Sequence, residues 1–116
     1  MKRVLIVEDD ILIAMFYQDI LEDLGCEVCA IAVTADDAVA QARRLAPDLI
    51  LMDVRLEGRK DGVDAAEVIH AEGLCDAVVF VTGSLDAQKR VAQDHPRATL
   101  FKPVGRTELA AVLADI

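Results

Sequence analysis

Leu49-Ile50-Leu51-Met52-Asp53 places an aspartate directly after four apolar residues, a pattern typical of a strand that is buried on both faces. The acidic side chain then lies where the strand leaves the core. Three other short apolar runs end alike, in Glu8-Asp9-Asp10, Thr82-Gly83-Ser84 and Lys102-Pro103. Because the carboxyl ends of parallel strands line one edge of an open sheet, we expect these polar side chains to meet where such sheets bind ligands.

Strand patterns alternate with helical patterns along the whole chain. We expect strands at 3–8, 27–33, 48–53, 77–82 and 98–101. We expect helices at 10–24, 34–46, 63–72, 84–94 and 105–115. Five strand–helix units in succession predict a single α/β domain over residues 1–116, with a parallel sheet and helices on both of its faces.

Residues at the helix ends support these boundaries. Asp9 or Asp10 can cap the first helix, and Gly25 can end it in the left-handed conformation. Thr34 and Ser84 are the expected caps of the second and fourth helices. The first helix carries apolar residues close to helical spacing, at Ile11, Ala14, Met15, Ile20, Leu21 and Leu24. We expect the last helix to face the core with Leu109, Val112, Leu113 and Ile116.

Composition excludes several classes of function. The chain has 116 residues, of which 54% are hydrophobic, and fits one domain with a sizeable core. Its net charge of -9 opposes direct nucleic-acid binding and adhesion to an anionic membrane. No apolar run approaches the roughly 20 residues that span a bilayer. Met1-Lys2-Arg3-Val4 leads straight into a strand without a signal peptide, so we expect a cytoplasmic protein.

Two of the three cysteines, Cys26 and Cys29, have CxxC spacing. This spacing suits a redox pair or half of a zinc site, but also two core cysteines at the start of a strand. The second interpretation is favoured, because the sequence has no second cysteine pair, no histidine nearby and no helix beginning between the two cysteines.

Glu8, Asp9 and Asp53 converge if the first and third strands are neighbours. Three clustered carboxylates repel one another unless a cation neutralises them, and hard oxygen ligands suit Mg²⁺. Thr82 adds a hydroxyl and Lys102 a positive charge, which together with backbone N–H groups after Asp53 could bind a phosphoryl group. Each residue alone has a simpler interpretation, as a helix-end acid, a strand-end threonine or a surface lysine. The joint pattern is far more specific.

These segments resemble the motifs of response-regulator receiver domains of two-component signalling. The matching stretches are Val7-Glu8-Asp9-Asp10, Leu51-Met52-Asp53-Val54, Val81-Thr82-Gly83 and Phe101-Lys102-Pro103. The resemblance covers essentially the whole chain, in order and at the usual spacings, and includes an Asp-Gly motif at the start of the third helix. It implies a doubly wound, five-stranded parallel sheet of the flavodoxin-like (βα)5 type, with strand order 2-1-3-4-5.

The resemblance also implies how phosphoryl transfer would proceed. Asp53 would take the group from a phosphohistidine of a partner, its carboxylate oxygen forming an acyl phosphate. Thr82 and Lys102 would bind the phosphoryl oxygens. The Lys102–Pro103 bond would be cis and would aim the lysine into the site.

A magnesium site is implied by the same family pattern. Asp9 and Asp53 would ligate Mg²⁺, Glu8 would hold a metal-bound water, and the backbone carbonyl of Arg55 would complete the protein ligands. We further expect the Arg55 side chain to screen the phosphoryl group from water.

Two positions depart from the family pattern. Thr99 stands three residues before Lys102, where many receivers carry an aromatic ring that swings inward on activation. Gly83 stands where alanine or serine is frequent. The usual coupling of Thr82 to an aromatic side chain is therefore not expected here.

Two other functions compete with a phosphorylated receiver. A Mg²⁺-dependent aspartyl phosphohydrolase would carry a second acid two residues after the nucleophile, but Arg55 occupies that position and no residues remain for a cap domain. A receiver-like interaction module that no longer takes phosphate would have no need for the full set of site residues, which this chain retains.

Partners follow from the receiver hypothesis. A histidine kinase or phosphotransfer protein would dock near Asp53 against the first helix, with Ile11, Met15 and the Lys102-Pro103-Val104 loop as candidate contacts. A downstream protein target would read the switched surface near the fourth and fifth strands. The last two helices could serve as a homodimer or output surface.

Overall fold

The computed structural model describes residues 1–56, 58–83 and 98–116. Their strands form one parallel sheet in the order β2-β1-β3-β4-β5. The strands are β1 (Arg3–Val7), β2 (Glu27–Ala32), β3 (Leu49–Asp53), β4 (Val78–Thr82) and β5 (Ala98–Phe101). The expected α/β class, parallel sheet and strand order are thereby confirmed. The helix expected at 84–94, with its Ser84 cap, lies outside the described residues.

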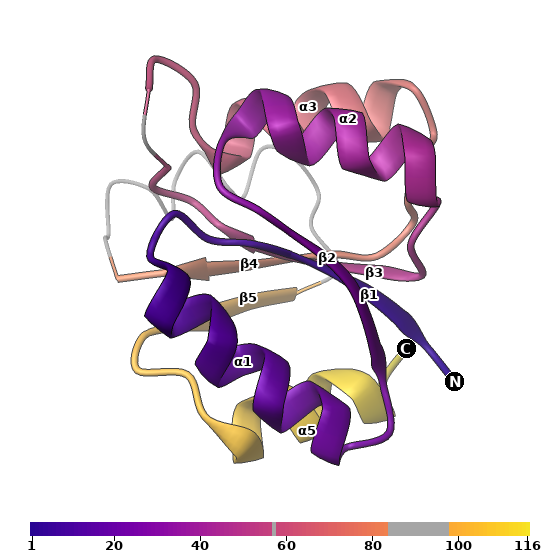
Figure 1. The fold of residues 1–116 in the computed structure, drawn as a ribbon, viewed down its shortest axis with the longest axis vertical. Coiled ribbons are helices and arrows are strands. Elements are labelled where there is room, and N and C mark those ends of the chain that lie inside the picture. The colour runs from indigo at the N-terminus through magenta and orange to yellow at the C-terminus, as the bar shows by residue number, and fades with distance from the viewer. Residues whose placement is uncertain (57, 84–97) are drawn as a thin grey trace.

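Helices cover both faces of the sheet (Figure 1). One face carries α1 (Ile11–Asp23) and α5 (Arg106–Ala114), and the other carries α2 (Ala35–Leu45) and α3 (Gly62–Ala71). Each pair of helices encloses its own hydrophobic cluster against the sheet. The sheet is therefore the middle of three layers, which explains why the central strands are nearly continuous apolar runs. None of the helices among the described residues is long and apolar enough to cross a membrane.

The residues that α1 buries against the sheet are only partly those of its apolar sequence pattern. Ala14, Tyr17 and Leu21 are its buried residues, spaced by three and four positions. Ile11 and Met15 belong to the apolar pattern, but both side chains are about half exposed. They leave an apolar strip on the surface of α1 rather than filling the core.

Polar caps fix where the helices begin. Asp10 accepts hydrogen bonds from the backbone N–H groups of Leu12 and Ile13, and Thr34 caps α2 by accepting one from Asp37. Of the two candidate caps, Asp10 is therefore the one that caps α1, and Asp9 is not. Gly25 has a φ of 92°, the left-handed conformation expected after α1. Because β1 ends at Val7 and α1 begins at Ile11, the two intervening acids before the cap stay at the sheet edge.

Candidate functional site

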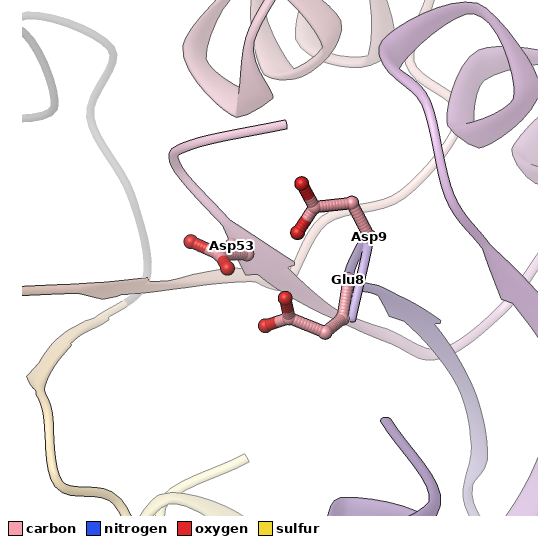
Figure 2. A group of neighbouring side chains, drawn as sticks. All are labelled: Glu8, Asp9 and Asp53. Atoms are coloured by element: carbon pink, nitrogen blue, oxygen red, sulfur yellow. The ribbon is translucent and has the colours of Figure 1, made fainter. Parts of the chain in front are cut away.

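Three carboxylates meet where β1 and β3 end (Figure 2). Glu8 and Asp9 follow β1 directly, and Asp53 is the last residue of β3. β1 and β3 are hydrogen-bonded neighbours in parallel register, with Val7 opposite Met52. One carboxylate oxygen from each of the three residues lies within 4.8 Å of the other two. The cluster therefore results from strand order, which brings residues 44 or more positions apart to the same sheet edge.

Glu8 is the most constrained member of the cluster. Its side chain is only 2% exposed, and Oε1 accepts a hydrogen bond from the backbone N–H of Asp10 at 3.1 Å. Oε2 is buried and has no hydrogen-bond partner among the described residues. Burial, and then the neighbouring Asp53 carboxyl, raise the pKa of Glu8 from 4.5 to about 8. An unpaired buried oxygen beside two further carboxylates fits a hard divalent cation such as Mg²⁺.

Asp53 is buried and held from two sides. Its Oδ1 accepts a hydrogen bond from the backbone N–H of Arg55 at 3.1 Å. Its Oδ2 lies 3.2 Å from the Lys102 ammonium, which follows β5 at the same edge of the sheet. The Lys102 backbone N–H in turn donates to the Thr82 carbonyl at 2.9 Å. The Lys102–Pro103 peptide bond is cis, as the family resemblance implied.

A pocket of about 410 Å³ opens beside the Asp53 carboxylate. Its lining consists of Asp53, Arg55, Thr82, Gly83 and Lys102. The pocket thus offers one carboxylate, a hydroxyl and an ammonium, with the exposed Arg55 side chain at its rim. The structure brings together every site residue that the sequence singled out: the three acids in one cluster, and the remaining three around this pocket.

Tyr17 was missed by the sequence analysis. It is almost fully buried on α1, and burial, followed by the negative charges of Glu8 and Asp53, raises its pKa to about 12. The available signal was its spacing, three residues after Ala14 and four before Leu21, which places it on the inner face of α1. The phenol therefore lies within electrostatic reach of Glu8 and Asp53, on the helix that follows β1.

Thr99 and the two CxxC cysteines lie away from this chemistry. Thr99 is half-buried within β5, opposite Phe80 of β4. Cys26 belongs to the hydrophobic cluster under α1 and α5, whereas Cys29 packs against the cluster on the other face and donates through Sγ to the Val4 carbonyl. Both thiols are free. Their placement on opposite faces of the sheet agrees with two core cysteines rather than a redox pair.

Comparison with known proteins identifies the family. Residues 4–114 match the response regulator receiver domain, and the chain therefore belongs to this family. The transcriptional regulatory protein PdtaR of Mycobacterium tuberculosis is 36% identical over 109 residues, which cover 93% of this chain and 53% of PdtaR. The chain thus spans about half the length of this curated relative.

Solved structures agree with this membership. The signal receiver domain of a modulated diguanylate cyclase from Desulfovibrio desulfuricans G20 superposes with a TM-score of 0.90 at 32% identity, covering 99% of this chain and 92% of that one. The receiver domain of the sensor histidine kinase PA1611 from Pseudomonas aeruginosa PAO1 gives a TM-score of 0.88 at 29% identity, covering 98% and 95%. That second structure has a magnesium ion coordinated in its active-site cleft.

Proposed function

We propose that this receiver domain accepts a phosphoryl group on Asp53 from a phosphohistidine and thereby switches the surface near β4 and β5. The observation that carries the proposal is the position of Asp53, buried between an acid cluster on one side and the Lys102 ammonium at 3.2 Å on the other. Such a carboxylate is oriented and kept from bulk water, while an open pocket beside it has room for the incoming group.

In the proposed reaction, an Asp53 carboxylate oxygen attacks phosphorus as the bond from phosphorus to the donor imidazole breaks. The electron pair of that bond stays on the imidazole nitrogen, which takes up a proton. Lys102 and Thr82 contact the phosphoryl oxygens and orient them, which supplies most of the catalysis because the protein has little covalent chemistry to perform. Glu8, Asp9, Asp53 and the Arg55 carbonyl would hold Mg²⁺, which neutralises charge on the transferred group when bound.

A decisive test uses acetyl phosphate as donor in the presence of MgCl₂. Intact mass should show one added phosphoryl group on the wild type and none on Asp53→Asn. Asp36→Asn, which alters an exposed aspartate on α2, is the matched control and should be labelled like the wild type. A wild-type protein that stays unlabelled, or an Asp53→Asn variant that is labelled equally, would contradict the proposal.

The protein donor is proposed to dock on the apolar strip of α1. Ile11, Leu12, Met15 and Phe16 are each at least half exposed, and Phe16 also lines a groove with Pro103 and Val104 of the loop after β5. Lys102 borders both this groove and the Asp53 pocket. A histidine kinase or phosphotransfer protein seated here would present its histidine to Asp53.

Met15→Glu separates docking from chemistry. We expect it to slow phosphotransfer from a protein donor while labelling by acetyl phosphate continues at the wild-type rate, because the small donor needs no docking surface. Val68→Glu on α3, an exposed apolar residue on the opposite face of the sheet, is the control and should leave both rates unchanged. Equal rates from the protein donor for Met15→Glu and wild type would remove this docking site.

The phosphohydrolase alternative remains less favoured. Arg55, not an acid, stands two residues after Asp53, and its side chain is exposed at the pocket rim. We therefore propose a signalling domain whose only reactions are its own phosphorylation and slow dephosphorylation. Sustained turnover of simple phosphate esters would argue for the hydrolase instead.

A further inference from the structure

The first residue of α3 touches the backbone of the phosphoryl acceptor itself. A Cβ built on Gly62 would lie 2.1 Å from the Asp53 carbonyl oxygen and 3.0 Å from the Asp53 carbonyl carbon. It would also lie 3.0 Å from Cγ of Met52. Contacts this short cannot be accommodated unless the end of β3 and the start of α3 move apart. Glycine is therefore required here by lack of space beside Asp53.

None of the other five glycines makes such a contact. Gly25, Gly58 and Gly73 have positive φ angles, and a Cβ on any of them would meet nothing within 4 Å. A Cβ on Gly83 or Gly105 would make only ordinary contacts, at 3.9 Å and 3.5 Å. Close packing against the site backbone is thus specific to Gly62.

Hydrogen bonds hold the peptide after Asp53 from two directions. The Val54 carbonyl accepts from the Gly62 N–H at 2.7 Å, and the Val54 N–H donates to the Val81 carbonyl of β4 at 3.1 Å. Val54 is itself buried. The backbone between Asp53 and Arg55 is therefore clamped between β4 and the start of α3, although Gly58, Arg59 and Lys60, which precede Asp61, are exposed.

Asp61 keeps the start of α3 in place. Its Oδ1 accepts from the backbone N–H groups of Val63 and Asp64 at 3.0 and 3.1 Å, and its own N–H donates to the Asp64 side chain at 2.8 Å. This reciprocal capping box fixes the first turn of the helix. The position of Gly62, and through it that of the acceptor backbone, thus depends on the capping of α3.

We propose that Asp61-Gly62 is a positioning element of the phosphorylation site, acting through the Asp53–Arg55 backbone. This rests on the proposed function, because the clamped segment carries the Asp53 carboxylate and the Arg55 carbonyl that would ligate Mg²⁺. Neither Asp61 nor Gly62 touches the transferred group. Their role is to hold two ligands at the separation that the ion requires, since Mg²⁺ demands near-ideal octahedral geometry.

Gly62→Ala tests the proposal through metal binding rather than phosphorylation alone. Its Cβ forces the Asp53 carbonyl aside, and misplacement by about 1 Å costs on the order of 100-fold in well-oriented sites. We expect Mg²⁺ affinity, measured by titration calorimetry, to fall at least ~10-fold, and acetyl phosphate labelling to slow in step. Gly105→Ala, at the start of α5, is the matched control and should bind Mg²⁺ as the wild type does.

Asp61 provides a second pair of variants should Gly62→Ala fail to fold. Asp61→Asn keeps a capping oxygen and should retain wild-type Mg²⁺ affinity, whereas Asp61→Ala removes it and should weaken Mg²⁺ binding about threefold or more. The Tm of each variant, measured by thermal unfolding, shows whether a loss of Mg²⁺ affinity merely follows from a loss of folding stability. Unchanged Mg²⁺ affinity in each of the Gly62→Ala and Asp61→Ala variants that folds, with only a lower Tm, would overturn the inference.

The inference and the proposed function fail in different ways. If the wild type neither binds Mg²⁺ nor takes a phosphoryl group from acetyl phosphate, the proposed function itself is wrong. If the wild type does both and the folded Gly62→Ala and Asp61→Ala variants match it, only the positioning role is wrong.

Discussion

β3 and β5 deliver charged residues to the same sheet edge but differ in how firmly they are held. β3 is central, and all five of its residues are buried. β5 is the edge strand, three of its residues are only partly buried, and Phe101 at its end is exposed. Asp53 therefore sits on a rigid support, whereas Lys102 is attached to a looser one with a side chain that is 35% exposed.

Under the proposed function, this difference gives the two partners of the ion pair distinct roles. A nucleophile must be fixed in orientation before the donor arrives, which a buried central strand ensures. A cation that moves together with the transferred group must be able to change position. An edge strand allows this movement more readily than a central strand. Phosphorylation would then act on the structure through Lys102 and the loop after β5 more readily than through β3.

The largest effect is expected in a stability comparison of the two strands. Leu51 of β3 and Leu100 of β5 pack against the same hydrophobic cluster, the first fully buried and the second partly. Leu51→Ala should lower the free energy of unfolding by about 2–5 kcal/mol, and Leu100→Ala by about 1 kcal/mol, because less apolar area is lost. Urea denaturation measures both, and equal losses would contradict the contrast between the strands.

The next largest effect is expected when the charge of Lys102 is removed. Lys102→Ala should slow labelling of Asp53 by acetyl phosphate roughly 100- to 1,000-fold, as for removal of one preorganised electrostatic group from an active site. Lys60→Ala, which removes an exposed ion pair with Asp36, is the control and should keep the wild-type rate. A rate loss in Lys102→Ala no larger than in Lys60→Ala would assign the electrostatic role elsewhere.

A smaller effect concerns pH and the acid cluster at the end of β1. The pKa of Glu8 is raised to about 8 in the folded protein, so protons compete with Mg²⁺ below that pH. Between pH 6 and 8, Mg²⁺ affinity should rise with pH, by up to about tenfold per unit. Calorimetric titrations should show this slope in the wild type and a weaker one in Glu8→Gln, and a flat wild-type profile would contradict the role of Glu8.

Glu8 should make the stability of the metal-free protein fall as pH rises, whereas it makes Mg²⁺ affinity rise. The folded state holds the Glu8 proton more tightly than the unfolded state does, so this contribution to stability is full below pH 4.5 and is lost as pH rises towards 8. Mg²⁺ should restore it by replacing the proton. Thermal unfolding at pH 6 and pH 8, with and without Mg²⁺, measures both halves of this linkage, and a metal-free Tm that rises over this range would contradict it.

The smallest effect is expected at the pocket rim. Arg55→Ala should speed dephosphorylation of Asp53 about two- to fivefold, because an exposed side chain shields the phosphoryl group only partly. Arg59→Ala, on the same loop but outside the Asp53 pocket, is the matched control. Loss of phosphoryl label over time measures both, and an unchanged rate in Arg55→Ala would remove its screening role.

Much of the fold and the convergence of site residues could be predicted from the sequence, because both depend on strand periodicity. Short apolar runs that end in Asp53, Glu8 or Lys102 locate the strand ends without knowledge of side-chain packing. Parallel order then places those ends on one edge.

Side-chain packing was beyond the reach of periodicity. Ile11 and Met15 belong to the apolar pattern of α1, yet both side chains are about half exposed. Spacing could place Tyr17 on the inner face of α1, but its electrostatic proximity to Glu8 and Asp53 depends on how α1 packs on the sheet. Gly62 likewise looks like an ordinary helix-start glycine until the Asp53 carbonyl is seen beside it. Both depend on distances between segments far apart in the sequence.

Tyr17 also gives the protein a built-in optical reporter. It is the single tyrosine of a chain that has no tryptophan, and it lies within the electrostatic reach of Glu8 and Asp53. Ultraviolet emission excited at the phenol band therefore originates from one ring that is sensitive to the charges of Glu8 and Asp53. Titrating the untagged protein with Mg²⁺, or following labelling in a stopped-flow cell, reads events at Asp53 without any attached dye.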